Sequence, residues 1–312
     1  MHPFRFGVQL AEASSGRDWA DQARKLEDLG YSTLFMPDHY DDTMLSPMPA
    51  LAAAAAATDT LRVGTLVLGN DYRHPAEVAK EAATVDLLSD GRLELGLGAG
   101  WMIADYEELG LDYDRAGVRI DRLAEAIQVV KGAWSPGPFS FTGDHYTIAD
   151  YDATPEPVQE PHPPLLIGGG GKRVLSLAAR EADIIGVNPS LAAGAVDPTI
   201  MDDALADATT VKIGWVRDAA GDRFDDIELQ VRYFLAAVTD DARGYAEAIA
   251  AGFGVDIDPE TALASSLALV GSVDEIVDRC YERREEWGFS YIVVGGDEIE
   301  SFAPVVERLA GQ

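Results

Sequence analysis

Four consecutive glycines, Gly168 to Gly171, follow an apolar run and lead directly into a segment of helical periodicity. The first amides of a helix have no intrahelical acceptor and lie at the positive end of the helix dipole, so this junction can bind a phosphate. Lys172 and Arg173 would add positive charge. The alternative interpretation is a tight turn with no ligand. A Walker A loop is excluded, because neither Ser nor Thr follows Lys172 in the required place.

A second glycine-rich segment runs from Gly96 to Trp101 with the spacing G-x-G-x-G. This spacing differs from the G-x-G-x-x-G of dinucleotide-binding folds, and no strand-helix-strand unit of the required kind surrounds it. Small residues such as Ala99 and Gly100 at the upper end of a strand can admit a flat ring against the backbone, with Trp101 as a wall. Close packing without a ligand is the alternative.

Asp38 and His39 end the second apolar run, and Gln9 and Glu12 lie at and just beyond the end of the first. In an α/β barrel these positions face the carboxyl-end rim, where barrel enzymes keep their chemistry. His39 could donate a hydrogen bond or exchange a proton near neutral pH, and Asp38 could orient a neighbouring donor. A purely structural histidine is the alternative. Glu12 and Gln9 are further candidates by position alone.

The composition narrows the classes of partner. The 312 residues carry 54 acidic and 24 basic side chains, a formal charge of −30, which disfavours nucleic acid and anionic membranes. No apolar run approaches the roughly 18 residues of a membrane span, and the first residues do not resemble an export signal, so we expect a cytoplasmic protein. The lone Cys280 predicts a buried thiol, and the five histidines show no metal-ligand spacing, so no metal site is predicted.

Eight apolar runs alternate with helical segments over nearly the whole chain, which predicts a (β/α)8 TIM barrel formed by a single domain, residues 1–312. The predicted strands are Phe4 to Leu10, Thr33 to Met36, Arg62 to Leu68, Leu93 to Gly98, Leu165 to Ile167, Asp183 to Val187, Glu228 to Val238 and Tyr291 to Val294. The predicted helices are Trp19 to Leu29, Pro49 to Ala57, Pro75 to Leu88, Arg115 to Trp134, Val174 to Ala182, Met201 to Asp207, Val273 to Trp287 and Ile299 to Leu309.

Segments that fit this template poorly are predicted to be insertions at the carboxyl-end rim, where they would shape substrate access. They are Pro136 to Pro164, with a hairpin at Thr142-Gly143-Asp144, then Leu191 to Gly221 and Thr239 to Pro259.

Several motifs spread along the chain resemble the luciferase-like monooxygenase superfamily, and especially its branch of coenzyme F420-dependent oxidoreductases. The resemblance rests on Phe6-Gly7-Val8-Gln9, Pro37-Asp38-His39, Tyr72-Arg73-His74-Pro75, Gly91 to Trp101, Arg115 to Ala133, Phe141 to Tyr146, the glycine run, Ala182-Asp183 and Leu269 to Ser272. It implies a bacterial-luciferase-like barrel that holds a tricyclic flavin or deazaflavin ring over the upper ends of its strands.

The resemblance also implies roles for individual residues. The phosphate would lie on Gly169, Gly170 and Gly171, and Asp38 and His39 would lie beside the reactive ring. A non-prolyl cis peptide often supports the ring in this superfamily, and it would fall near Thr65, Leu66 and Val67. A homodimer is expected by the same analogy.

The function that follows is an oxidoreductase transferring hydride between a small organic substrate and C5 of coenzyme F420, with His39 assisting proton movement. The alternative is an FMN-dependent monooxygenase that uses O2 and receives reduced flavin from a separate reductase. A flavin-binding protein without turnover is a third possibility. Sugar-phosphate dehydrogenases of this superfamily carry a glutamate where this chain has Trp101, so that substrate is disfavoured.

Overall fold

The computed structural model describes residues 1–40, 43–195, 199–253 and 257–312, with the side chains of 199, 252 and 253 left aside. Parallel strands pair in a closed ring in the order β3-β2-β1-β13-β10-β9-β8-β5, and β5 pairs back to β3. The strands are β1 (Arg5–Gln9), β2 (Thr33–Met36), β3 (Arg62–Thr65), β4 (Leu68–Gly69), β5 (Leu93–Gly98), β8 (Leu165–Gly169), β9 (Ile184–Val187), β10 (Glu228–Arg232) and β13 (Phe289–Gly295). The predicted eight-stranded α/β barrel is confirmed.

The third barrel strand is divided into β3 and β4. The Leu66–Val67 peptide bond between them is cis, within the range expected from the family resemblance. Both pieces pair with β5, so the interruption makes a bulge without opening the barrel.

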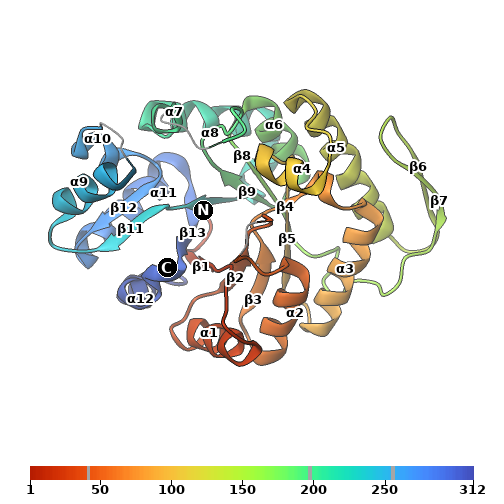
Figure 1. Cartoon of the computed structure of the whole chain (residues 1–312), viewed down its shortest axis with the longest axis horizontal. Coiled ribbons are helices and arrows are strands. Elements are labelled where there is room, and N and C mark those ends of the chain that lie inside the picture. The colour runs from red at the N-terminus through yellow and green to blue at the C-terminus, as the bar shows by residue number, and fades with distance from the viewer. Residues whose placement is uncertain (41–42, 196–198, 254–256) are drawn as a thin grey trace.

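Helices cover the outside of the barrel (Figure 1). They are α1 (Gly16–Asp28), α2 (Pro47–Ala57), α3 (Pro75–Leu88), α5 (Ala116–Ala133), α6 (Lys172–Glu181), α8 (Ala206–Ala220), α11 (Val273–Trp287) and α12 (Ile299–Leu309). Local signals start some of them: the Ser15 hydroxyl caps α1, and Ser272 with Glu275 forms a capping box on α11. None of the described helices is long and apolar enough to cross a membrane.

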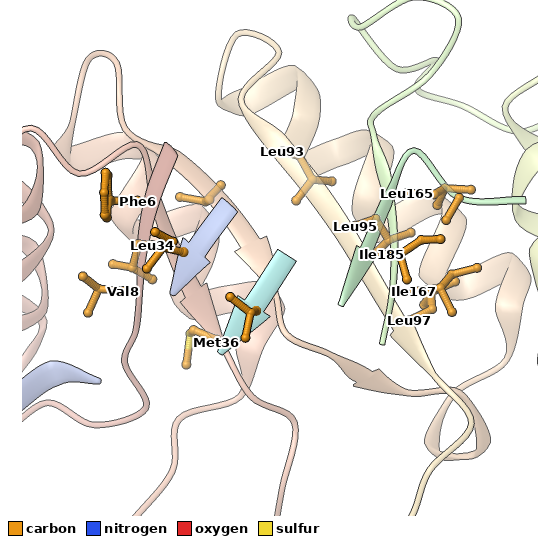
Figure 2. Close-up of a cluster of buried hydrophobic side chains, with 14 of the residues drawn as sticks. Phe6, Val8, Leu34, Met36, Leu93, Leu95, Leu97, Leu165, Ile167 and Ile185 are labelled. Atoms are coloured by element: carbon orange, nitrogen blue, oxygen red, sulfur yellow. The ribbon is translucent and has the colours of Figure 1, made fainter. Parts of the chain in front are cut away.

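Alternate side chains of the strands point outward and form the main core with these helices. Figure 2 shows this layer along several strands, which contribute Phe6, Val8, Leu34, Met36, Leu93, Leu95, Leu97, Leu165, Ile167 and Ile185. Cys280 on α11 joins it, and burial raises the pKa of its thiol to about 12. The prediction of a buried thiol is therefore confirmed.

The amino end of the barrel interior is closed by an ionic cluster. Glu94, only 1% exposed, accepts hydrogen bonds from Arg5 (2.7 Å), Arg62 (2.6 Å) and the Tyr291 hydroxyl (2.8 Å). Arg5 also pairs with Glu228 and stacks 3.8 Å from the centre of the Tyr291 ring. Burial alone would raise the pKa of Glu94, but the charges of Arg5 and Arg62 hold it below its ordinary value.

A few large side chains fill the middle of the barrel interior, and each packs against glycines of neighbouring strands. The Phe35 ring would lie 3.0 Å from a Cβ on Gly7 and 2.7 Å from one on Gly64. Val67, in the bulge, occupies the corresponding space beside β5, 2.6 Å from a Cβ on Gly98. The glycine spacing in β5 therefore makes room for the bulge, which is the close-packing interpretation of that part of the motif.

Three predicted boundaries are wrong. The predicted helix Met201 to Asp207 covers the end of one helix and the start of the next. Leu191 to Gly221 contains the barrel helix α8, which follows a short α7 (Thr199–Asp203), so this segment is not wholly an insertion. The predicted strand Glu228 to Val238 is two strands: β10 ends at Arg232, and β11 (Leu235–Val238) pairs with β12 (Ala268–Gly271) outside the barrel. Polar residues on the buried face of α8 obscure its period, and apolar content alone does not show where a strand changes sheets.

Three other additions extend the template. Helices α9 (Ala242–Phe253) and α10 (Pro259–Ala264) accompany β11 and β12 in a lobe beside the barrel (Figure 1). The predicted hairpin is confirmed as β6 (Phe139–Thr142) and β7 (Thr147–Tyr151). A short α4 (Ile103–Leu109), which the sequence did not predict, follows β5 at the rim.

Candidate active site at the barrel mouth

The carboxyl ends of the barrel strands bring the predicted site residues to one end of the molecule. Gln9, Asp38 and Gly170 follow or end β1, β2 and β8, and these strands run parallel around the same barrel. A separate hollow of about 500 Å³, lined by residues including Glu300 and Pro304, lies between α1 and α12 on the outside. That hollow contains none of the predicted site residues.

His39 is held by a carboxylate that the sequence did not single out. Its Nδ1 lies 2.7 Å from an oxygen of Asp105, a buried residue in the first turn of α4. Asp105 also accepts hydrogen bonds from the Tyr40 amide (3.1 Å) and the Tyr72 hydroxyl (3.0 Å). Because an ionised carboxylate can only accept hydrogen bonds, Nδ1 of His39 donates to Asp105, and in the neutral imidazole Nε2 is then the acceptor.

The environment of His39 also includes Trp101, whose ring packs edge-to-face against the imidazole at 5.6 Å between centroids. Trp101 and Asp105 both follow β5, so one short segment builds the wall and the support of His39. The only sequence signal for Asp105 is an acidic residue early in a helix directly after a strand end, which is common on solvated helices as well.

Asp38 forms its hydrogen bonds with Arg73 and Gly69 and not with His39. Its carboxylate forms two hydrogen bonds with Arg73 (2.5 and 2.9 Å) and accepts a third from the Gly69 amide (2.9 Å). Burial opposes the charge of Arg73, but Asp38 raises the pKa of that guanidinium above its ordinary value. These bonds tie the end of β2 to the segment after the bulge, so the geometry favours a positioning role for Asp38.

Gln9 connects three strands across the mouth. Its Nε2 donates to the Leu66 carbonyl at 2.9 Å, and its Oε1 accepts from Arg232 Nε at 3.1 Å. Thr65 is buried, and its hydroxyl exchanges hydrogen bonds with the backbone of Gly96, both at 2.8 Å. Gln9 and Thr65 therefore hold the Leu66–Val67 bulge from both sides. The side chains of Leu66 and Val67 are partly exposed.

The glycine loop leads into α6 as predicted. Gly171 is the N-cap residue of α6, no side chain caps the helix, and a Cβ on Gly171 would meet nothing within 4 Å. A Cβ on Gly170 would instead lie 2.4 Å from the Asn188 carbonyl oxygen. Lys172 is exposed, whereas Arg173 pairs with Asp121 and donates to the Gly117 carbonyl (3.1 Å). The uncapped amides and open space fit a phosphate, with Lys172 the better placed cation.

The remaining predicted site residues, Ala99, Gly100 and Glu12, differ in how far they are exposed to solvent. Ala99 and Gly100 are partly exposed beyond β5, and Gly100 takes a left-handed conformation (φ 73°) in which a Cβ would lie 2.0 Å from the Tyr106 hydroxyl. Glu12 is exposed and accepts a hydrogen bond from Thr43 at 2.7 Å. Its role stays a prediction.

Residues 1–209 match the family of luciferase-like monooxygenases, which is more than half of the chain. The protein belongs to this family.

The names of the curated relatives mention two kinds of cofactor, reduced FMN and coenzyme F420. The chain is 34% identical over 164 residues to an FMNH2-dependent dimethylsulfone monooxygenase from Pseudomonas putida, covering 52% of this chain and 45% of the relative. It is 30% identical over 218 residues to an F420-dependent glucose-6-phosphate dehydrogenase from Microbacterium testaceum, covering 66% and 64%. The matched segments thus span less than two thirds of these relatives.

Solved structures agree on the fold. The F420-dependent tetrahydromethanopterin reductase from Methanopyrus kandleri superposes with a TM-score of 0.78 at 19% identity, covering 99% of this chain and all of the other. An F420-dependent secondary alcohol dehydrogenase gives 0.77 at 21% identity, with 99% of each chain covered. At these identities the likeness shows the architecture alone.

Proposed function

We propose that this protein is a coenzyme F420-dependent oxidoreductase acting on a small organic substrate. One observation carries the proposal: the uncapped start of α6, with open space at Gly171, lies at the same end of the barrel as the His39–Asp105 pair. An anion site and a proton-exchanging group at one mouth suit a phosphate-bearing redox cofactor. The names of several curated relatives agree with it.

The residues present fit such a cofactor. The amides following Gly169, Gly170 and Gly171 would hold the phosphate, with Lys172 adding charge and Arg173 bracing the helix through Asp121. Leu66 and Val67 would support the ring from below, with Gln9 and Thr65 fixing the bulge. The segment Ala99 to Trp101 would bound the ring on the side of β5.

The deazaflavin, when bound, supplies a hydride acceptor or donor at C5. The chain supplies the proton route: Nε2 of His39 can take a proton from a substrate hydroxyl, because Asp105 holds the other proton on Nδ1. In the reverse direction the doubly protonated imidazole can return it. Asp38 keeps the neighbouring backbone in place through Arg73 and Gly69, and Glu12 stands at the rim as a further candidate.

The alternative is an FMN-dependent monooxygenase supplied with reduced flavin by a separate reductase, and it is favoured by the similarity to the dimethylsulfone enzyme. A flavin-binding protein without turnover would share the same phosphate site. We further propose a cytoplasmic location and a homodimer. Trp101 argues against a sugar-phosphate substrate, although dehydrogenases with that substrate are among the relatives.

Titration of the purified protein with coenzyme F420 and with FMN, followed through the fluorescence of each cofactor, tests the proposal. We expect F420 to bind at least tenfold more tightly. The reverse order would support the monooxygenase, and affinity for neither cofactor would overturn both. The third alternative, a flavin-binding protein, would be supported by binding without turnover. The substrate panel contains a secondary alcohol, small aliphatic hydroxy acids and glucose 6-phosphate, each tried with oxidised and with reduced cofactor.

Replacing His39 tests its role. We expect His39→Ala to reduce turnover by about 10²-fold or more, the usual contribution of a positioned acid or base, while the Kd for the cofactor stays within about twofold. The control is His162→Ala, since His162 precedes β8 and lies at the amino end of the barrel. An unchanged rate in His39→Ala removes this residue from catalysis.

A further inference from the structure

Arg232 is a cation at the barrel mouth that the mechanism above does not use. It is the last residue of β10 and follows Glu228 and Gln230 at every second position, so its side chain belongs to the inward-facing set. One guanidinium nitrogen donates to Gln9, and another donates to the Tyr233 carbonyl. Both acceptors are neutral.

No carboxylate of the described residues forms an ion pair with Arg232 within 4.0 Å. The nearby acidic group is Glu298, in the turn that follows β13. A Cβ on Gly295 would lie 3.0 Å from Arg232 Nη2 and 2.7 Å from Glu298 Oε2, so both side chains converge on the inward face at the end of β13. Burial lowers the pKa of Arg232 to about 10, opposed by Glu298, and burial raises the pKa of Glu298.

Other arginines of the described residues differ from Arg232 in how their guanidinium nitrogens are bound. Arg73 is bound by both oxygens of Asp38, and Arg5 contacts both Glu94 and Glu228. The buried Arg119 and Arg283 have no ion pair among the described residues, but both terminal nitrogens of each donate to a carbonyl or a hydroxyl. Nη2 of Arg232 has no hydrogen-bond acceptor among the described residues, and an arginine nitrogen without a partner is available to a ligand. At neutral pH Arg232 remains a cation, and its Nη2 lies beside Gly295 at the carboxyl end of β13.

The surroundings add an apolar surface. Phe234, directly after β10, is 58% exposed, and its ring centre lies 4.8 Å from the Arg232 guanidinium carbon. Gln9 joins Arg232 to the Leu66 carbonyl in the bulge, where the ring of the cofactor is proposed to lie. A ligand held by Arg232 would therefore lie beside that ring.

We propose that Arg232 binds the carboxylate of the substrate at the barrel mouth, with Phe234 against the apolar part, so that the substrate is a small aliphatic monocarboxylic acid. A single negative charge is favoured over the two of a phosphate ester, because Glu298 lies beside the same space and repels additional charge. The assignment rests on the proposed function for its place in the reaction, but the binding of the anion depends on Arg232 alone.

The test uses three probes with the same alkyl chain: hexanoate, 1-hexanol and hexyl phosphate. Each is titrated into the 312-residue protein at constant ionic strength by calorimetry. We expect hexanoate to bind more tightly than the other two. Arg232→Met should weaken hexanoate at least about tenfold, as loss of a charge-assisted hydrogen bond predicts, and leave hexanol unchanged. Glu298→Gln should increase the affinity for hexanoate, and it should increase the affinity for hexyl phosphate by a larger factor.

Matched variants separate the possible failures. Arg243→Met removes an exposed arginine on α9 and should leave all three affinities unchanged. Arg232→Gln keeps a donor for Gln9 and replaces the Met variant if that protein does not fold, as judged by circular dichroism. Equal binding of hexanoate and hexanol, or undiminished hexanoate binding without Arg232, overturns the proposal. Because these titrations need no cofactor, failure of F420 and FMN to bind is a separate result that concerns the proposed function.

Discussion

At the scale of single residues, the proposed chemistry depends on which nitrogen of His39 carries a proton. Asp105 decides this, since its Oδ2 faces Nδ1 of His39 while its Oδ1 accepts from the Tyr40 amide. A histidine at a strand end can serve as base only if the nitrogen facing the substrate is unprotonated. The predicted pair of Asp38 and His39 is thus replaced in this role by a pair that is distant in sequence.

We expect Asp105→Asn to reverse the tautomer of His39. In the variant the amide oxygen can keep the Tyr40 contact, so the amide nitrogen replaces Oδ2 and donates to Nδ1, which leaves the proton on Nε2. Nitrogen-15 NMR of the imidazole reports the protonated position directly, and turnover should fall about 10²-fold or more if His39 is the base.

Tyr72→Phe is the control, because it removes one donor to Asp105 but leaves the contact with His39. The same tautomer in Asp105→Asn as in the wild type would contradict this account of the pair.

At the scale of elements, the start of α6 serves two purposes that a substitution can separate. An aspartate at the N-cap satisfies the first amides of a helix, so Gly171→Asp should leave the stability unchanged or raise it by a few tenths of a kcal/mol. The same carboxylate would occupy and repel the phosphate position, so we expect cofactor affinity to fall at least tenfold. Thermal unfolding and the fluorescence titration measure the two effects.

Gly170→Ala provides the opposite pattern. Its Cβ would collide with the Asn188 carbonyl at 2.4 Å, so the loop must shift and the unfolding temperature should fall. Undiminished cofactor affinity in Gly171→Asp would mean that the phosphate does not lie on α6.

The elements themselves could mostly be predicted, because parallel strands buried on both faces produce short apolar runs at regular intervals. All eight barrel strands lie where these runs occur. Helix α8 could not be recognised, since Thr209 and Lys212 lie on its buried face, where Lys212 donates to the Asn188 and Asp203 carbonyls. A tertiary hydrogen bond of this kind leaves no periodic signal.

At the scale of the whole molecule, the ionic cluster at the amino end of the barrel should control acid stability. The folded-state pKa of Glu94 is below its ordinary 4.5, so its stabilisation is complete above that pH and is lost as the pH falls through the folded value. Glu94→Gln should cost about 3 kcal/mol or more at pH 7, because Arg5 and Arg62 lose a buried partner.

Urea midpoints between pH 3 and pH 7 measure this effect, and the difference between wild type and variant should shrink below about pH 4.5. Glu247→Gln, in an exposed pair with Arg243, should change the stability by less than about 0.5 kcal/mol. A difference for Glu94→Gln that stays constant with pH would show that the carboxylate charge is not what stabilises the barrel.

The sequence by itself determined the barrel, the end at which the candidate site lies and the glycine junction before α6, because apolar runs and the residues that start a helix are local properties of the chain. Only the tertiary structure decided that Asp105 rather than Asp38 supports His39, that Gly96 and Gly98 accommodate Val67, and that Arg232 has no acidic partner among the described residues. These contacts join residues far apart in the chain, and their distances depend on how the strands close into a ring.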